Sequence, residues 1–367
     1  MVEKQHKVWF SKALKNWHLV ENNRKMPWKG IKDPYKIWLS EIILQQTRVD
    51  QGWAYYEKFI QAYPTIQDLA KAKDEKVFKL WEGLGYYNRC RNLLHTAREI
   101  TNHSKGIFPN TYEELLSLKG IGPYTAAAIA SFAFNLPYAV VDGNVFRVLA
   151  RFHGISTPTD TKEGVAIFNT LANQSLAKKQ PGLYNQAIMD FGATVCTPSN
   201  PDCVACNLSS KCVAFNVNKV NQLPVKLKRI TKKKRHFDFF CFNLNGTWML
   251  QQRGEGDVWN GLFQFYVLEQ DRMPVFSDSY LDTVLKHQFG LSQKQWKLIG
   301  GDKLPKLYKQ VLTHQTIEAR FICIQLSKMP KMLQNALWVK PKQLSKYAFP
   351  KIINDFLVTF HHGSALE

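Results

Sequence analysis

Four cysteines crowded into residues 196–212 constrain this chain more than any other feature. Their spacing is Cys-x6-Cys-x2-Cys-x5-Cys, and the residues are Cys196, Cys203, Cys206 and Cys212. Four thiolates brought together by short loops can hold either a tetrahedral zinc ion or a cubane iron–sulfur cluster. Zinc sites usually pair two Cys-x2-Cys knuckles, and here there is one. The loop also contains two prolines and a lysine. This tight, cationic pattern favours a structural [4Fe–4S] cluster over zinc.

Charge and length narrow the function classes. The chain has 367 residues, and 49 Lys and Arg stand against 29 Asp and Glu, which gives a formal net charge of +20. That excess favours a polyanionic partner such as DNA over a merely basic soluble protein. Seven cysteines, an odd number, argue against a disulfide framework. The sequence lacks an apolar signal core and a long apolar run, so we expect a cytoplasmic protein without a membrane span. We also expect it to be a nucleoid-associated monomer.

Composition and hydrophobic periodicity along the chain predict two domains. Residues 1–216 are patterned as helices, residues 217–235 form a basic linker, and residues 236–367 form a smaller α+β domain. In the first part, helices are expected at 35–46, 144–152 and 184–191, with Asp74 as one cap and Thr111 and Glu114 as a capping box. In the second part, strands are expected at 237–244, 248–252, 262–268 and 318–326, and helices at 279–289 and 350–360. Asn245-Gly246 predicts a tight hairpin between the first two strands.

A second motif is Leu118-Lys-Gly-Ile-Gly-Pro-Tyr-Thr-Ala126. A helix that ends at Gly120, a turn through Gly122 and a helix that begins near Pro123 form a helix-hairpin-helix. Glycines there let backbone N–H groups approach a DNA phosphate at a helix N-terminus. Alone, Gly-x-Gly before a helix is often a plain turn. Its place shortly before Asp142 in a basic helical chain favours DNA binding.

Two carboxylates carry the expected chemistry. Glu41 lies in an apolar helical stretch, so desolvation should raise its pKa and make it a general acid near neutral pH. Asp142, in Val140-Val-Asp-Gly-Asn144, stands just before a helix, and taken by itself an N-cap is the simpler interpretation. One protonated and one ionised carboxyl group are what cleavage of a glycosidic bond through a cationic sugar requires.

These motifs together resemble the MutY family of adenine DNA glycosylases over essentially the whole chain. The matching segments are Arg24-Lys-Met-Pro-Trp-Lys29, Trp38-Leu-Ser-Glu-Ile-Ile-Leu-Gln-Gln-Thr47, Gly83-Leu-Gly-Tyr-Tyr87, the hairpin, Asp142-Gly-Asn144 and the cysteine block. The resemblance implies a helix-hairpin-helix glycosylase domain with an iron–sulfur loop at 196–212, followed by a MutT-like (Nudix-like) domain. It implies base-excision repair, in which adenine opposite 8-oxoguanine or guanine is flipped out of duplex DNA and hydrolysed from its sugar.

The resemblance also implies a role for each matching residue. Glu41 is the acid that protonates adenine N7, Asp142 stabilises the sugar cation, and Tyr124 and Asn144 assist. The adenine pocket is lined by Arg24, Trp28, Lys29, Leu44 and Gln186. DNA is contacted by Gln46 and Tyr86 as a wedge and by Gly120 and Gly122 of the hairpin. Four of these residues also have plainer interpretations: Trp28 and Leu44 suit a core, Gln186 a helix surface and Tyr86 a buried ring.

Two departures from the family pattern stand out. Lys29 replaces the usual Arg, which loses bidentate geometry. In the second domain, Leu312-Thr313-His314 replaces the Phe-Ser-His loop that reads 8-oxoguanine, so Thr313 and His314 are the lesion-recognition candidates. The stretch from 277 to 290 also lacks the Arg-Glu-x-x-Glu-Glu helix that binds magnesium in Nudix hydrolases. A hydrolase function of that domain is therefore disfavoured.

Two alternatives remain at this stage. An endonuclease III-like enzyme for oxidised pyrimidines would share the fold, the hairpin, the aspartate and the cluster, but it carries a Schiff-base lysine where this chain has Tyr124 and lacks the second domain. A non-catalytic DNA-binding protein that uses the cluster as a redox sensor would have no use for a buried Glu41, which is costly without a task.

Overall fold

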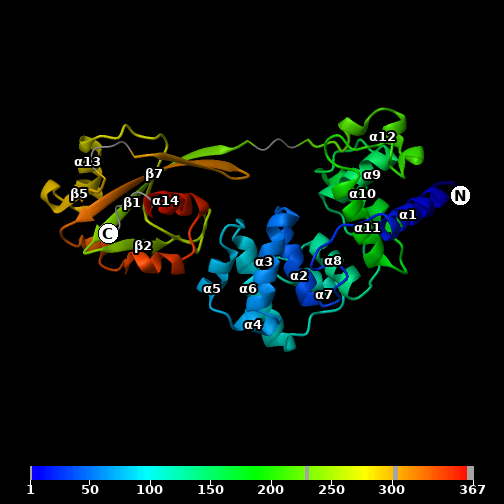
Figure 1. Ribbon diagram of the computed structural model, residues 1–367, viewed down its shortest axis with the longest axis horizontal. Helices are drawn as coiled ribbons and strands as arrows, with labels where there is room; N and C mark the ends of the chain where they lie inside the picture. The colour runs from blue at the N-terminus through cyan, green and yellow to red at the C-terminus, as the bar shows by residue number, and fades with distance from the viewer. Residues whose placement is uncertain (1, 228–230, 301–304, 362–367) are drawn as a thin grey trace. The chain divides into compact units, whose positions relative to one another are not determined.

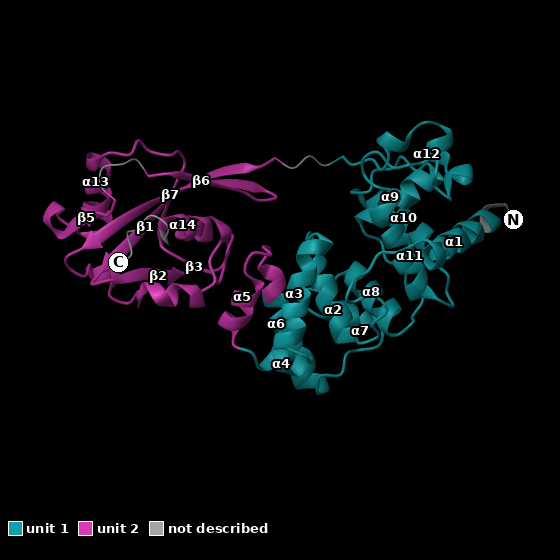
Figure 2. Cartoon of the chain, in the orientation of Figure 1, with its two compact units in different colours: residues 1–72, 91–228 teal, residues 73–90, 229–367 magenta. Residues whose placement is uncertain are grey.

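A computed structural model of the chain describes residues 2–227, 231–300 and 305–361. The chain forms two compact units (Figures 1 and 2). Unit 1 comprises residues 1–72 and 91–228, and unit 2 comprises residues 73–90 and 229–367. Residues 228–230 of the predicted linker lie outside the described residues. Within the described residues, no helix combines the length and apolar character that crossing a membrane requires.

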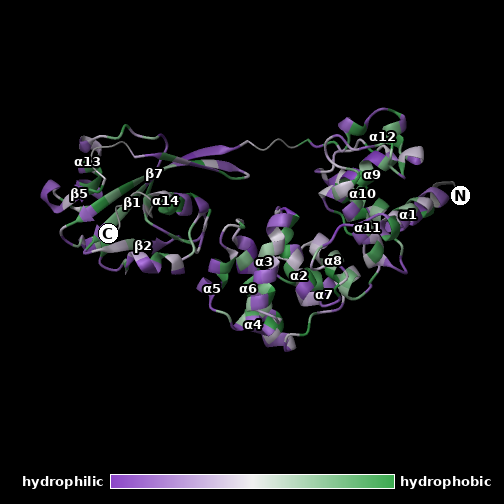
Figure 3. Ribbon diagram, viewed as in Figure 1, coloured by the Kyte–Doolittle hydropathy of each residue, from purple (hydrophilic) through white to green (hydrophobic). Residues whose placement is uncertain are grey.

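Unit 1 is built from helices, as the sequence predicts. Its helices are α1 (Val2–Val20), α2 (Pro34–Leu44), α3 (Val49–Ala62), α4 (Ile66–Lys71), α6 (Asn88–Ser104, whose first residues belong to unit 2), α7 (Tyr112–Ser117), α8 (Pro123–Ala133), α9 (Gly143–His153), α10 (Lys162–Ser175), α11 (Pro181–Thr194) and α12 (Val213–Asn216), with 3-10 turns η1 (Ser209–Lys211) and η2 (Val220–Gln222). In Figure 3, α6 alternates between hydrophilic and hydrophobic colours, as expected for a helix that covers a core with one face.

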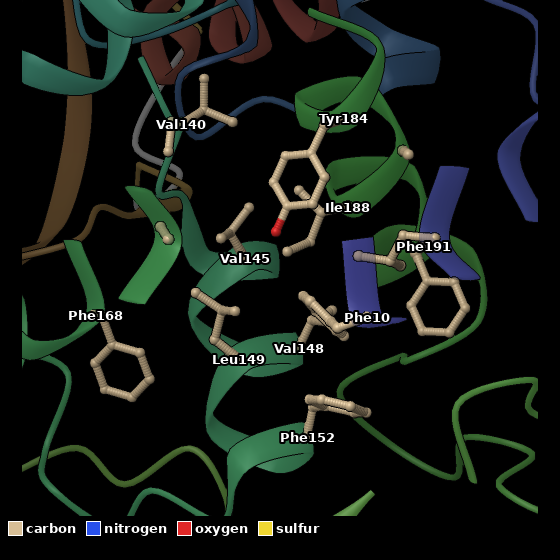
Figure 4. Close-up of a cluster of buried hydrophobic side chains, with 14 of the residues drawn as sticks. Phe10, Val140, Val145, Val148, Leu149, Phe152, Phe168, Tyr184, Ile188 and Phe191 are labelled. Carbon is tan, nitrogen blue, oxygen red and sulfur yellow. The ribbon is translucent and has the colours of Figure 1, made fainter. Parts of the chain in front are cut away.

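A core of aromatic and aliphatic side chains holds α1, α9, α10 and α11 together (Figure 4). Phe10, Phe152, Phe168 and Phe191 are almost entirely buried in it. Arg151 lies at the edge of this core, and its guanidinium donates to the carbonyls of Thr197, Pro198, Val220 and Leu223. The core therefore fixes α9 and, through one buried arginine, the cysteine-rich loop beside it.

Helix ends in unit 1 follow local chemistry and refine the sequence-based bounds. Thr111 caps α7 through the Glu114 N–H, as predicted, but α7 ends at Ser117 and not at Gly120, because Leu118 is extended. α2 ends at Leu44, two residues earlier than predicted, because Gln45 has a non-helical ψ of 113° and Gln46 then adopts a left-handed backbone.

Unit 2 is organised around one mixed sheet. Its strands are β1 (Lys233–Leu244), β2 (Thr247–Gln252), β3 (Phe263–Gln264), β4 (Tyr266–Gln270), β5 (Trp296–Leu298), β6 (Leu307–Val311), β7 (Gln315–Leu326) and β8 (Leu337–Val339). The long strands β1 and β7 run parallel in the centre, and the path through the sheet is β3-β2-β1-β7-β5. β1 begins inside the predicted linker, because its ladder with β7 starts at the pair Lys233 and Gln315.

The predicted hairpin is present. Asn245 and Gly246 both have positive φ, and the register pairs Leu244 with Thr247 across the turn. The predicted strand 262–268 is interrupted at Phe265, whose side chain is buried in the core, so it forms β3 and β4. The helices of unit 2 are α5 (Asp74–Trp81), α13 (Asp278–Phe289) and α14 (Lys351–His361), with η3 (Gln293–Gln295), η4 (Lys331–Leu333) and η5 (Pro341–Lys346).

The segment 73–90 belongs to unit 2 through specific bonds. Lys79 donates to the Tyr347 carbonyl, and Glu82 accepts from the Phe349 N–H and the Asn354 amide. The sequence suggested Asp74 as the cap of α5, but Asp74 does not cap this helix. Lys73 is the N-cap residue, and Asp74 lies in the first turn, where an acid also favours the helix dipole.

Candidate active site

Three helices converge on one cavity in unit 1. Its volume is about 730 Å³, and α2, α8 and the start of α9 bring Glu41, Tyr124 and Asp142 to its wall. All nine residues predicted for catalysis or for the adenine pocket line it, and Gln46 does as well. They are Arg24, Trp28, Lys29, Glu41, Leu44, Tyr124, Asp142, Asn144 and Gln186. The volume suits a base-sized ligand with part of its sugar.

Glu41 is a buried acid with one hydroxyl partner. Its side chain belongs to the buried face of α2, and the Tyr124 hydroxyl donates to its Oε2 over 2.7 Å. Burial raises the pKa of Glu41, the Tyr124 bond lowers it and Asp142 raises it slightly, and the net value is about 7. Glu41 can therefore hold a proton at neutral pH and release it to a base in the cavity.

Asp142 does two things at once. Oδ1 accepts from the Val145 N–H at 2.8 Å, which is the N-cap bond of α9, and Oδ2 accepts from the Asn144 amide at 2.9 Å. The N-cap interpretation is thus correct, and the residue also faces the cavity. Burial raises the pKa of Asp142, while the Val145 and Asn144 bonds and nearby Arg147 oppose that rise. These donors favour the ionised form that a cationic sugar needs.

Asn144 is held in turn by Arg147. The guanidinium donates to Asn144 Oδ1 at 2.8 Å and to the Cys196 carbonyl at 2.7 Å. Gly192 packs so closely on Asn144 that an added Cβ would lie 2.7 Å from the Asn144 Cβ. A continuous hydrogen-bonded path thus runs from Asp142 to the start of the cysteine loop.

Trp28 satisfies both of its interpretations, whereas Leu44 is only partly buried and serves as a lining residue. Trp28 is 8% exposed and meets Tyr56 edge to face at 5.3 Å, yet it still lines the cavity. Leu44 lines the cavity and lies against Gly52, where an added Cβ would come within 2.8 Å of it. Both residues therefore give the cavity a rigid apolar wall.

Sequence reasoning missed Asp190, the buried carboxylate that pairs with the predicted pocket residues Arg24 and Lys29. Asp190 of α11 is fully buried and binds Arg24 at 2.8 Å and Lys29 at 3.3 Å. Asn22 and His18 complete this group. The criterion that identified Glu41, an acid within an apolar helical stretch, applies equally to Asp190, which follows Met189 and precedes Phe191.

The four cysteines surround one small cavity of about 30 Å³. Cys196, Cys203, Cys206 and Cys212 all line it, and its other walls are mainly apolar. Burial, the largest cause, and the neighbouring thiols together raise the pKa of the Cys206 thiol to about 11. Among the described residues, no three His, Cys, Asp or Glu side chains converge to hold a single metal ion. Four thiols around a shared cavity, with Arg151 Nη1 at 3.5 Å from Cys196 Sγ, fit an anionic cluster.

The helix-hairpin-helix is present between α7 and α8. Gly120 has a φ of +80°, and an added Cβ would lie 2.6 Å from the Asn92 Cβ, so only glycine fits. Gly122 is the N-cap of α8, and nothing lies within 4 Å of an added Cβ there. The open helix N-terminus suits a phosphate.

The predicted wedge residues are both strained. Gln46 and Tyr86 have φ of 56° and 49°, a region that residues other than glycine rarely adopt. Tyr86 is 45% exposed, so its ring is not the buried ring of the plainer interpretation. Left-handed backbone at such tips is frequent at functional positions.

The lesion-recognition candidates lie in unit 2. Thr313 and His314 form the tip between β6 and β7, His314 is exposed, and the Tyr86 and Thr313 hydroxyls are hydrogen-bonded to each other. α13, where a Nudix hydrolase would carry its magnesium-binding glutamates, has Asp278 and Asp282 as its acids.

Comparisons with known proteins agree with this geometry. Residues 39–171 match the HhH-GPD superfamily of base excision DNA repair proteins, and residues 239–358 match the NUDIX domain. An adenine DNA glycosylase of Buchnera aphidicola is 32% identical over 360 residues, which is 96% of this chain and 98% of that protein. The chain belongs to the adenine DNA glycosylase family.

Further relatives and solved structures are similar to this chain. An adenine DNA glycosylase of Arabidopsis thaliana is 34% identical over 86% of this chain and 57% of its own length, and a human one is 43% identical over 56% and 39%. A thermostable thymine-DNA glycosylase shares the fold with a TM-score of 0.55 and 28% identity, covering 59% of this chain and 100% of that one. An endonuclease III in a trapped covalent DNA complex has the same fold, with a TM-score of 0.52 at 20% identity.

Proposed function

We propose that this family member removes mispaired adenine from DNA by hydrolysing its N-glycosidic bond. The observation that carries the proposal is the Glu41–Tyr124 pair, a carboxyl group with a pKa of about 7 in the same cavity as Asp142. Few structural roles require a protonatable acid there, whereas departure of a purine requires one.

In the proposed reaction, Glu41 gives its proton to adenine N7 as the bond to the sugar breaks and its electrons pass to the base. Asp142, held ionised by Val145 and Asn144, stabilises the cationic sugar. Water then adds to the sugar carbon, and its proton returns to Glu41. Tyr124 orients Glu41 and carries no amine, so base removal is not coupled to strand cleavage.

The test is adenine release from duplexes that contain A:8-oxoguanine, A:G and A:C. Free adenine with an abasic strand that breaks only after alkali supports the proposal. Borohydride trapping of the protein on oxidised-pyrimidine duplexes would instead support the endonuclease III alternative. Binding without release of any base would support the non-catalytic alternative.

We further propose that unit 2 reads 8-oxoguanine opposite the adenine. Three observations support this role: the NUDIX match, a helix α13 without the magnesium glutamates, and a hydroxyl and an imidazole at the β6–β7 tip. Losing two neutral contacts of about 0.5–1.5 kcal/mol each should weaken the preference for A:8-oxoguanine over A:G about tenfold.

The measurement is the ratio of single-turnover rates on the two duplexes for Thr313→Ala with His314→Ala. The matched control is Thr283→Ala with His287→Ala, an exposed threonine and histidine on α13. Equal losses on both duplexes in the tip variant would contradict the lesion-reading role.

We propose a [4Fe–4S] cluster on the four cysteines, which would stabilise the loop at 196–212. The supporting observation is the shared cavity lined by all four thiols. Anaerobically purified protein should contain about four irons per chain and absorb near ~400 nm. One zinc per chain without iron would contradict it.

A further inference from the structure

The charged part of the active-site cavity wall is held by one carboxylate, that of Asp190. Asp190 has no exposed side-chain surface, and it stands on α11 at helical spacing from Gln186. Its Oδ1 accepts from Arg24 Nη1 at 2.8 Å, and its Oδ2 lies 3.3 Å from Lys29 Nζ. Lys29 also donates to the Arg24 carbonyl at 3.1 Å. One buried anion thus fixes two cationic side chains that line the cavity.

The loop between α1 and α2 is tied to the same carboxylate. Asn22 Nδ2 donates to Asp190 Oδ2 at 2.8 Å and also lies 2.8 Å from His18 Nδ1. An amide nitrogen only donates, so His18 Nδ1 accepts and the ring is neutral. Burial, followed by Lys29, lowers the pKa of His18, which agrees with that assignment. Asp190 is therefore balanced by Arg24 and Lys29, not by His18.

We propose that Asp190 is a positioning residue for the adenine pocket, fixing Arg24 and Lys29 against the base that Glu41 protonates. The proposal rests on the proposed adenine release. It also accounts for Lys29 at a position where the family usually has Arg. A flexible ammonium held by Asp190 and the Arg24 carbonyl keeps its place without bidentate geometry.

The loop from Asn22 to Lys29 contains no regular helix or strand, so side-chain bonds have to hold it. Without the Asp190 carboxylate, the Arg24 and Lys29 cations would lie close together in the pocket wall. Coulomb repulsion would then move both side chains. A pocket displaced by about 1 Å can lose up to ~100-fold in rate, because proton transfer to the base depends on alignment.

The test is Asp190→Asn in the full-length holoprotein, which keeps the shape of the side chain and removes its charge. Single-turnover adenine release should slow by at least about tenfold. The falling limb of its pH profile should move to lower pH, since loss of an anion beside two cations favours ionised Glu41. The double variant Asp190→Asn with Lys29→Met, which removes one charge of each sign, should recover part of the rate and move the limb back.

The matched control is Asp355→Asn, because Asp355 is an exposed carboxylate that forms an ion pair with Lys351. This variant should change neither the rate constant nor the pH limb. A merely structural role for Asp190 would lower the amplitude of the single-turnover phase but leave its rate constant and pH limb unchanged, and that result overturns the proposal. If the parent is active and the rate constant of Asp190→Asn lies within about threefold of the parent's, this proposal alone is overturned. A parent that releases no adenine overturns the proposed function as well.

Discussion

Two buried carboxylates line the same cavity from different helices and have opposite surroundings. Glu41 on α2 meets a neutral hydroxyl, that of Tyr124. Asp190 on α11 meets the cations Arg24 and Lys29. A buried acid without a cation favours its protonated form, whereas one between cations stays an anion. The comparison teaches that burial alone does not make a carboxyl group a proton donor. The partner of the carboxyl group decides whether that group supplies a proton or holds neighbouring side chains in place.

The largest effect should come from removing the proton. Glu41→Gln keeps the shape and the Tyr124 contact but cannot give a proton, so adenine release should fall by at least about 1000-fold. Duplex affinity should stay close to that of the parent. Single-turnover release and a binding titration measure the two quantities, with Glu163→Gln on the exposed side of α10 as the control. Release by Glu41→Gln at the parent rate would remove Glu41 as the acid.

Asp142→Asn should have the next largest effect. The amide keeps an oxygen for the Val145 N–H, so the N-cap of α9 persists, but the negative charge at the sugar is lost. Loss of one preorganised electrostatic contact predicts a rate lower by about 100- to 1000-fold. Thermal unfolding should change little. A large fall in melting temperature with a nearly normal rate constant would show that the cap is the main role of Asp142.

Tyr124→Phe removes the hydroxyl group that donates to Glu41 and leaves the Glu41 carboxyl group in place. The Tyr124 bond lowers the pKa of Glu41, so its loss should raise that pKa above about 7. The protonated form is present below the pKa and lost as pH rises through it, so the falling limb should move to higher pH. The rate at low pH should drop less than about tenfold, the worth of one hydrogen bond. A limb that moves to lower pH would contradict the assignment.

The smallest effect is expected from Lys29→Arg, which keeps the ion pair with Asp190. Lys29→Arg keeps the positive charge against Asp190, and Asp190 holds Arg24 in either case. Adenine release should therefore stay within about threefold of the parent, since the ion pair is retained. Lys29→Met, which removes the charge, is the informative comparison in the same assay. Equal losses in Arg and Met variants would mean that the shape of Lys29, not its charge, matters.

Part of this site could be predicted from sequence and part could not. Glu41 was identifiable because its neighbours in α2 are apolar, and Gly120 because a left-handed turn requires glycine. Asp190 stands 166 residues from Arg24, so only the fold shows which charges meet it. The same holds for Arg147, whose bonds join Asn144 to the cysteine loop.

The sheet of unit 2 shows the same limit. Asn245-Gly246 predicted its hairpin because both residues adopt positive φ readily. The short strands β5 and β8 were missed, because three residues carry too little alternation to be recognised. Their pairing with β7 and β2 is set by contacts distant in sequence.

The titration of Glu41 itself tests the central claim most directly. Carbon-13 NMR of protein labelled at glutamate carboxyl groups, with the Glu41 signal assigned by its absence in Glu41→Gln, measures that pKa without any assay of activity. The account predicts a midpoint near 7 in the free protein, because burial outweighs the Tyr124 bond. A midpoint near the ordinary value of 4.5 would leave Glu41 ionised at neutral pH and contradict its role as the acid.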